Sequence, residues 1–313
     1  VGVFMAQKAW ILRYGELGLK SRIVRRQFQR ALSKNMEGLA IAEKISIIED
    51  RIKSVEVVTS DSPSAEVENL LCHVLGVVAI DPAKIISEDI DPETVAIAIL
   101  QDDPLQGQER TFGVKTKRLG PKGNYRSQDY SAQIGHYMCK HDSSLSVNLS
   151  NPDVGVRLVL EPEKVWILGK RIVSAGGLPP GVQGDVLCRI KDEESMLSSF
   201  LVMRRGSRIL PVEGSDDELL EILRKWDPYL GRNSKIIDLH GKKKQRHPWG
   251  VVGLSVEEGE SLIERRESDV KTVPLSTLEP LCGWTEEEVE DLSKHIREPS
   301  LHVCMPNLDA WVS

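Results

Sequence analysis

Lysine side chains alternate with apolar ones along one short stretch of the sequence, in a pattern suited to binding a polyanion. On a β-strand, Phe112 and Val114 point to one face. Lys115 and Lys117 then project from the opposite face. A glycine-rich turn with further basic side chains and one aromatic follows at residues 119–126. Because ammonium and guanidinium groups pair with phosphates, this stretch predicts an RNA-binding surface.

A second basic surface is predicted on a helix that starts after Ser21. Apolar residues recur at every fourth position from Val24 to Met36. Basic residues recur with the same spacing but two residues out of step, about 200° around the helix axis, at Arg22, Arg26, Arg30 and Lys34. One face should lie in the core and the other should bind phosphates; the alternative is a basic face that is only solvated. The basic charge of the surrounding segment favours phosphate binding.

The net charge of −6 is distributed unevenly along the chain. Residues 1–60 hold 11 Lys and Arg against 6 Asp and Glu, and residues 111–175 hold 10 against 5. Residues 61–110 hold 2 against 11, and residues 176–313 hold 18 against 25. Screening limits each charge to about 8–10 Å at physiological salt, so the local patch decides whether a polyanion binds. We therefore expect RNA binding to depend on the two basic blocks and not on residues 176–313.

The composition is that of a globular chain with two or three domains: 313 residues, of which 40% are hydrophobic and 28% charged. No apolar run is long enough to cross a bilayer and no signal peptide is visible, so no membrane partner is expected. The five cysteines are widely spaced and include no C-x-x-C pair, which argues against a disulfide framework and a structural zinc site. We expect a cytoplasmic protein without a bound metal.

The order of the apolar patterns predicts an α+β N-terminal half. Residues 1–88 follow the βαββαβ order of a ferredoxin-like fold, with the two middle strands expected at 44–48 and 52–58. Residues 89–175 add an acidic helix, the basic strand, a helix capped by Ser127 and a β-hairpin. The second segment is therefore expected to form a small α+β module.

Several motifs of this half resemble a THUMP domain in the form found in tRNA 4-thiouridine synthetases. They are the basic strand, the Arg126-Ser127 helix start and residues 151–157 and 176–179. Residues 13–20, Arg-Tyr-Gly-Glu-Leu-Gly-Leu-Lys, resemble the opening of that family's N-terminal ferredoxin-like domain. The resemblance implies that the partner is the acceptor end of a tRNA. The implied contacts, with Tyr125 available to stack on an unpaired base, are Lys115, Lys117, Arg118, Lys122, Tyr125, Arg126 and Arg157.

Residues 174–184 are rich in glycine and proline and are expected to form a linker. After them, strands and helices alternate, which predicts an α/β domain with a parallel sheet. The predicted strands are 185–190, 208–212, 235–239, 251–254 and 270–273. The predicted helices are 195–205, 216–226, 256–266 and 285–296. The expected domains are a ferredoxin-like domain at 1–88, a THUMP domain at 89–175 and a PP-loop-like domain at 176–313.

In the 4-thiouridine synthetases, the first strand-to-helix turn of this last domain is a PP-loop, Ser-Gly-Gly-x-Asp-Ser, which holds the pyrophosphate of ATP. The resemblance places that loop on Ile190, Lys191, Asp192, Glu193, Glu194 and Ser195. Both glycines are replaced, and three consecutive carboxylates should face the space that phosphates would occupy. We therefore expect a tRNA-binding protein without a cofactor and without ATP-dependent adenylation. The alternative reading of the carboxylates is a favourable acidic first turn of a helix.

The same family carries sulfur as a persulfide on a cysteine late in this domain. Cys304, with His302 two residues away, is the candidate here, and a buried cysteine on a short strand is the alternative. With chemistry retained, the chain would be a tRNA sulfurtransferase that uses ATP and Mg²⁺ and receives sulfur from another protein, since no rhodanese sequence follows Ser313. A third possibility is a subunit that delivers tRNA to a separate modifying enzyme. The sequence contains no signature of a methyltransferase, zinc deaminase or pseudouridine synthase.

Overall fold

The computed structural model describes residues 8–15, 21–52, 55–102, 107–119, 125–237, 243–245, 247–263 and 274–299. The chain divides into two compact units. Unit 1 comprises Val1–Leu12, Ile48–Asp61 and Asp81–Ile172. Unit 2 comprises Arg13–Ile47, Ser62–Ile80 and Val173–Ser313.

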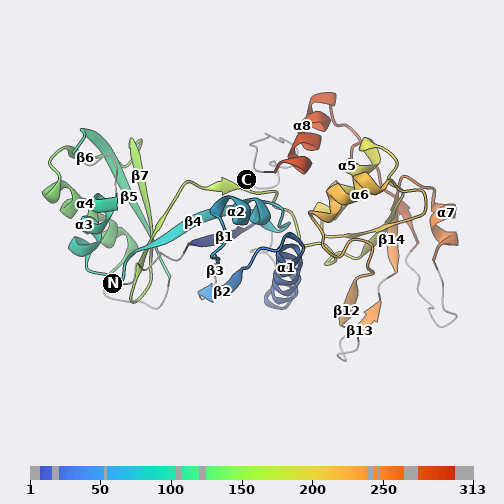
Figure 1. Cartoon of the computed structure of the whole chain (residues 1–313), viewed down its shortest axis with the longest axis horizontal. Helices are drawn as coiled ribbons and strands as arrows, with labels where there is room; N and C mark the ends of the chain where they lie inside the picture. Colours follow the sequence, from blue (N-terminus) through green and yellow to red (C-terminus); the bar gives the residue numbers. More distant parts are fainter. Residues whose placement is uncertain are drawn as a thin grey trace. The chain divides into compact units, whose positions relative to one another are not determined.

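The first six elements have the predicted βαββαβ order of a ferredoxin-like fold (Figure 1). They are β1 (Ala9–Tyr14), α1 (Arg22–Glu43), β2 (Ile48–Ile52), β3 (Val55–Thr59), α2 (Ser64–Cys72) and β4 (Val77–Ser87). The strand expected at 44–48 is wrong, because α1 continues through Glu43. Lys44 ends this helix in the left-handed conformation, with a φ of 58°. The first middle strand therefore starts only at Ile48.

A nine-stranded sheet has the order β2-β3-β1-β4-β8-β7-β5-β6, with β9 beside β4. Its later strands are β5 (Arg110–Arg118), β6 (Leu145–Val147), β7 (Val154–Leu160), β8 (Val165–Leu168) and β9 (Ile172–Val173). β5 and β7 are parallel, and β7 and β8 form the predicted antiparallel hairpin. Helices α3 (Pro92–Asp102) and α4 (Ser127–His141) share a buried core with these strands around Phe112 and Leu158.

Helix α4 forms where the apolar spacing predicts it. Tyr130, Ile134 and Met138 are 0%, 0% and 3% exposed, so one stripe of the helix lies in the core. The predicted cap at Ser127 is wrong by one residue. Arg126 has the extended backbone of an N-cap, and Ser127 is already the first helical residue.

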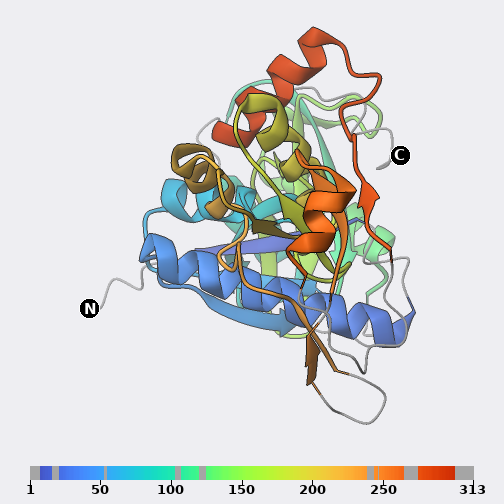
Figure 2. The same cartoon turned by 90° about the vertical axis from the view of Figure 1, so that its right-hand side faces the viewer.

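The C-terminal part of unit 2 is the predicted α/β fold (Figure 2). Its four parallel strands have the order β11-β10-β14-β15 and are β10 (Asp185–Cys188), β11 (Arg208–Pro211), β14 (Pro248–Val252) and β15 (Ser276–Thr277). The helices are α5 (Glu193–Arg204), α6 (Asp217–Arg224), α7 (Val256–Ser261) and α8 (Glu286–Arg297). Residues of α5, α6 and α8 pack with Val186 and Cys188 of β10, whereas Val256 of α7 packs with Leu187. Alternate residues of this central strand are thus buried on opposite faces of the sheet.

Two predicted strands of this domain differ in the structure. The strand expected at 235–239 does not join the parallel sheet. It is β12 (Lys235–Ile237), which pairs antiparallel with β13 (Lys243–Gln245) in a separate hairpin. The strand expected at 270–273 lies outside the described residues.

The glycine- and proline-rich segment at 174–184 is not an exposed linker. Residues 174–180 are buried in unit 2. The Leu178 N–H donates to the carbonyl oxygen of Arg204 at 2.8 Å, and Arg204 Nε donates to the Ala175 carbonyl oxygen at 2.7 Å. Gly177 has a φ of +73°, and a Cβ there would lie 2.3 Å from the Arg204 carbonyl oxygen. Glycine allows close backbone approach at this position, so these residues are packed and do not form the predicted linker.

Candidate nucleic-acid interface and nucleotide loop

The lysines of β5 lie on the exposed side of the strand in unit 1. Phe112 and Val114 are buried in the core that contains α3 and α4. Lys115 and Lys117 alternate with them along the strand and are exposed. The parallel pairing with β7 sets Lys115 directly beside Arg157. The strand therefore has one apolar and one basic face, as its alternation predicts.

Arg118 and Tyr125 make contacts within unit 1. Arg118 Nη1 donates a hydrogen bond to the Tyr125 carbonyl oxygen, at 3.0 Å. The Tyr125 ring is half-buried, with its centroid 5.0 Å from that of Tyr130. Arg126 is exposed at the start of α4, and Lys122 lies outside the described residues. Tyr125 thus presents only part of its ring for stacking on a base.

Arg157 is held by a buried carboxylate. Its Nη1 lies 2.9 Å from Oδ1 of Asp81, whose side chain is fully buried, and its Nη2 donates to the Gly169 carbonyl oxygen. Arg171 binds the same carboxylate through Nε at 2.8 Å and Nη2 at 2.9 Å. Two guanidinium groups therefore compensate one buried charge, and Arg157 has a structural partner that its sequence position did not reveal.

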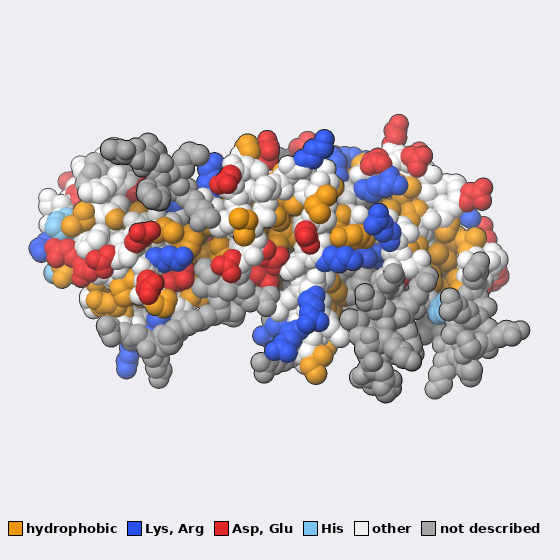
Figure 3. Space-filling model, turned by 60° about the horizontal axis from the view of Figure 1, so that its bottom comes forward, with side chains coloured by type: hydrophobic (Ala, Val, Ile, Leu, Met, Phe, Trp, Pro, Cys, Tyr) orange, Lys and Arg blue, Asp and Glu red, His pale blue; other side chains and the backbone are white. Residues whose placement is uncertain are grey.

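Helix α1 presents the predicted basic face in unit 2. Its apolar stripe is buried from Phe28 to Met36. Arg26, Arg30 and Lys34 are exposed, and Lys and Arg side chains gather over α1 in Figure 3. Among the residues that the structure describes, no carboxylate forms an ion pair with these two arginines. Like charges four residues apart destabilise a helix by about 0.2–0.5 kcal/mol per pair, a cost that a polyanion would offset if it bound to this face.

The basic face of α1 lacks a described side chain at Arg22, and at Lys34 it meets residues from a later part of the chain. Arg22 is helical, but its side chain lies outside the described part. The Lys34 ammonium lies 4.4 Å from the ring centroid of Tyr229, a residue 195 positions further along the chain. Arg232 Cζ lies 5.8 Å from the same centroid. Spacing could not reveal this contact; the one local signal was Gly38 in the interior of a helix, where glycine is unfavourable.

Residues 190–195, which we call the nucleotide loop, are held by hydrogen bonds to their own side chains at the start of α5. The Ser195 N–H donates to Asp192 Oδ1 at 2.9 Å, which makes Asp192 the N-cap of the helix. Ser195 Oγ accepts the backbone N–H groups of Lys191 at 3.0 Å and Asp192 at 3.2 Å. The hydrogen bond from the Ser195 backbone is the main cause that lowers the pKa of Asp192. Three backbone donors that a PP-loop would offer to phosphates are therefore used by the loop's own side chains.

Glu193 does not face the phosphate space, contrary to the expectation for three consecutive carboxylates. Its two oxygens pair with Arg297 of α8, at 2.6 Å and 2.7 Å, and it accepts a hydrogen bond from Ser293 Oγ. Arg297 lowers the pKa of the Glu193 carboxyl. Glu194 remains exposed beside Asp192. With a carboxylate at the N-cap and no glycine in the turn, these residues do not fit a bound triphosphate.

The cysteines of the described residues differ in exposure and in the pKa of their thiols. Cys72 and Cys188 are buried, and burial raises the pKa of their thiols to about 11 and about 12. Cys282 is exposed, whereas Cys304 lies outside the described residues. Within the described ranges, no three His, Cys, Asp or Glu side chains are grouped as metal ligands. The described helices also include none with the length and apolarity needed to cross a bilayer.

Two family models match the chain. The ThiI ferredoxin-like domain matches residues 9–80, and the THUMP domain matches residues 92–168. The chain is 30% identical over 223 residues to a probable tRNA sulfurtransferase of Thermococcus kodakarensis, covering 69% of this chain and 58% of that protein. It is also 30% identical over 236 residues to a probable tRNA sulfurtransferase of Methanocaldococcus jannaschii, covering 70% and 61%. The chain thus spans about three fifths of the length of these relatives.

Two solved structures have the same fold over almost the whole chain. A crystal structure of a Pyrococcus horikoshii protein has a TM-score of 0.67 at 23% identity, covering 92% of this chain and 99% of that one. A 4-thiouridine synthetase–RNA complex with bound ATP has a TM-score of 0.64 at 20% identity, covering 98% and 95%. The shared fold is a ferredoxin-like and a THUMP domain followed by an α/β domain with a parallel sheet.

Proposed function

Because this chain carries a ThiI ferredoxin-like domain followed by a THUMP domain and is related to proteins named tRNA sulfurtransferase, we propose that it binds the acceptor end of tRNA in the cytoplasm without activating it with ATP. A protein of the same fold has been solved as a complex with RNA, which supports RNA as the partner. The five cysteines without a disulfide pattern support a reducing compartment.

The observation that carries tRNA binding is the basic face of β5 within the THUMP domain. Lys115 and Lys117 are exposed there, while the other face of the strand is buried with α3 and α4. Phosphate contacts by such side chains supply most of the affinity of RNA-binding surfaces and carry no sequence preference. Arg126 adds a cation to this surface of unit 1, and the α1 arginines of unit 2 offer separate candidate contacts to phosphates. Arg157 is not counted among these phosphate contacts, because it is already paired with Asp81.

The absence of adenylation is supported by the loop before α5. The side chains of Asp192 and Ser195 occupy backbone donors that a phosphate-binding turn needs. The carboxylate at the N-cap also repels an anion at the position where the helix N-terminus would attract one. We therefore assign the domain a structural role in presenting tRNA, with no resident cofactor.

The test of the proposal is a salt-dependent binding measurement. With about 4–6 phosphate contacts, log affinity for tRNA should fall against log salt with a slope of roughly −3 to −5. In fluorescence anisotropy, Lys115→Glu/Lys117→Glu should weaken binding roughly tenfold or more and flatten the slope by about two. Arg224→Glu/Lys294→Glu is the matched control, since it makes the same charge change at exposed ion pairs of α6 and α8. Equal affinity of both double variants would exclude the β5 face as the binding surface.

A second candidate function is favoured by the names of the relatives: an ATP-dependent tRNA sulfurtransferase that forms 4-thiouridine. It would need a persulfide on Cys304 and sulfur from a donor protein. Incubation with tRNA, Mg-ATP and a persulfide donor, followed by assay of 4-thiouridine, separates the two functions. Product formed by the wild type and Cys282→Ser but not by Cys304→Ser would support this candidate. A delivery subunit would instead form no product and would co-purify with a tRNA-modifying enzyme.

A further inference from the structure

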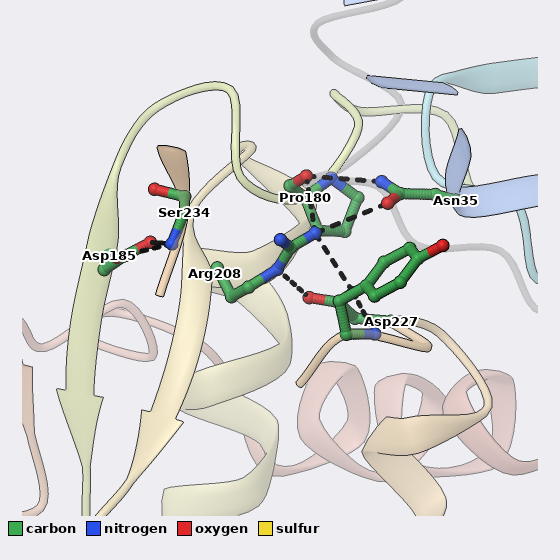
Figure 4. Close-up of polar contacts among 7 residues, drawn as sticks. Asn35, Pro180, Asp185, Arg208, Asp227 and Ser234 are labelled. Atoms are coloured by element: carbon green, nitrogen blue, oxygen red, sulfur yellow. Dashed lines mark hydrogen bonds and ion pairs between the residues drawn. The ribbon is translucent and has the colours of Figure 1, made fainter. Parts of the chain in front are cut away.

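In unit 2, the loop of residues 227–234 is held at both ends by buried carboxylates (Figure 4). At its start, Asp227 Oδ2 lies 2.8 Å from Arg208 Nε, and the two side chains are 0% and 9% exposed. At its end, Asp185 accepts a hydrogen bond from the Ser234 N–H at 2.9 Å. A loop fixed in this way loses little conformational entropy when it binds a ligand.

The arginine at the start of the loop also binds helix α1. Arg208 Nη2 lies 3.4 Å from Asn35 Oδ1 and donates to the Pro180 carbonyl oxygen at 3.2 Å. Asn35 Nδ2 donates to the same carbonyl oxygen at 3.2 Å (Figure 4). These hydrogen bonds are buried, so they fix the position of α1 against the loop more strongly than exposed ones would.

A close approach brings the outer side of α1 to the same loop. A Cβ at Gly38 would lie 2.8 Å from Pro228, so only glycine fits at this position without a steric clash. The Tyr229 hydroxyl donates to the carbonyl oxygen of Lys34 at 3.4 Å, and the Lys34 ammonium lies over the Tyr229 ring. The ring thus holds the lysine at the point where the basic face of α1 meets the loop.

The cations continue from the helix onto the loop. Arg30 and Lys34 are one helical repeat apart, about 6 Å along the axis. Lys34 Nζ and Arg232 Cζ lie 4.4 Å and 5.8 Å from the centroid of one ring, so both cations lie against the same tyrosine side chain. All three side chains are exposed, and no carboxylate among the described residues pairs with any of them. The three positive groups form a row that crosses from α1 to the α/β fold.

We infer that α1 and the 227–234 loop form one surface that binds the sugar–phosphate backbone of the tRNA, with Arg30, Lys34 and Arg232 each facing a phosphate. The inference rests on the proposed function and extends it to the α/β fold. It replaces the expectation from charge counts that residues 176–313 take no part in binding. A row of exposed cations without carboxylate partners suits a sugar–phosphate strand, because each cation can bind a separate phosphate of that strand.

The test uses the full chain, labelled tRNA and anisotropy titrations at several salt concentrations. Arg232→Ala and Lys34→Ala should each weaken binding roughly fivefold and flatten the salt slope by about one. Arg224→Ala is the control, because it removes the same charge from an exposed position on α6 of the same unit. Thermal unfolding confirms that each variant is folded.

The outcomes separate this inference from the function on which it rests. If Lys115→Glu/Lys117→Glu weakens tRNA binding while Arg232→Ala and Lys34→Ala do not, the α1–loop surface is wrong and the proposed function stands. If none of these variants changes binding, both fail. If Arg232→Ala abolishes binding of poly-glutamate but leaves tRNA binding unchanged, the row of cations binds an acidic protein segment and the inference is wrong.

Discussion

The guanidinium of Arg157 lies 2.9 Å from the carboxylate of Asp81, which is fully buried in unit 1. Removing one partner of a buried ion pair leaves an uncompensated charge, which is far more costly than losing an exposed ion pair. The contact therefore gives Arg157 a role in stability that is separable from any role in RNA binding.

Arg157→Met should lower the free energy of unfolding by about 2 kcal/mol, less than the full cost of stripping a buried charge because Arg171 remains on the carboxylate. Urea unfolding measures this change, and Arg171→Met should lower the free energy of unfolding by a similar amount. The salt slope of tRNA binding should be the same as in the wild type. An unchanged stability together with a flatter slope would return Arg157 to the RNA-binding surface.

Asp192→Ala should destabilise the protein by about 1 kcal/mol, because it removes the side-chain cap of α5. The comparison is Glu194→Ala, which removes an exposed carboxylate two residues away that forms no hydrogen bond or ion pair within the described residues. Both variants should bind tRNA normally. Equal unfolding midpoints for the two variants would show that the carboxylate of Asp192 does not cap the helix.

The fold should lose stability in mild acid through His295. This side chain is 5% exposed, and burial, with Arg204 and His73 adding to it, lowers its pKa from about 6.5 to about 4. Between these values the unfolded chain binds a proton that the native state does not, so stability falls as the pH drops through this window, by about 3 kcal/mol in all. The pKa of His73 is also lowered, chiefly by burial.

His295→Phe tests this pH dependence, since its ring can keep the contacts that the imidazole makes with Trp226 and Phe200. Unfolding free energies should be measured from pH 7 to pH 4.5. The loss on acidification should be smaller in the variant than in the wild type, by up to about 1.4 kcal/mol per pH unit. Parallel curves for the two proteins would mean that His295 takes up a proton as readily in the native state as in the unfolded chain.

Local periodicity was enough to predict the elements that carry the basic residues. The stripe of Tyr130, Ile134 and Met138 and the alternation around Lys115 depend only on spacing within one element, and the structure has both. The packed segment at 174–184 could not be predicted, because glycine permits both a mobile chain and a close backbone approach. Only the tertiary contacts of Gly177 decide between them.

The ion-pair partners of charged side chains could not be predicted from the sequence either. Glu193 finds Arg297 at a separation of 104 residues, and Arg157 finds Asp81 at 76. Neither pair leaves a trace in spacing or composition, since long-range ion pairs follow from how elements pack. The sequence therefore predicted the strand that carries Lys115 and the helix that follows Asp192, but not the partners of Glu193 and Arg157.

We propose that this chain binds tRNA and that its nucleotide loop is closed to ATP, and one calorimetric experiment tests both parts of the proposal. Mg-ATP is titrated into the protein alone and into the protein saturated with tRNA, so that the tRNA titration itself shows that the sample is active. We expect saturable heat from tRNA and none from Mg-ATP at submillimolar concentrations, because Asp192 and Ser195 occupy the donors of the loop. Saturable binding of Mg-ATP with a micromolar Kd in either titration would show that the loop is open to nucleotide and would favour the ATP-dependent sulfurtransferase.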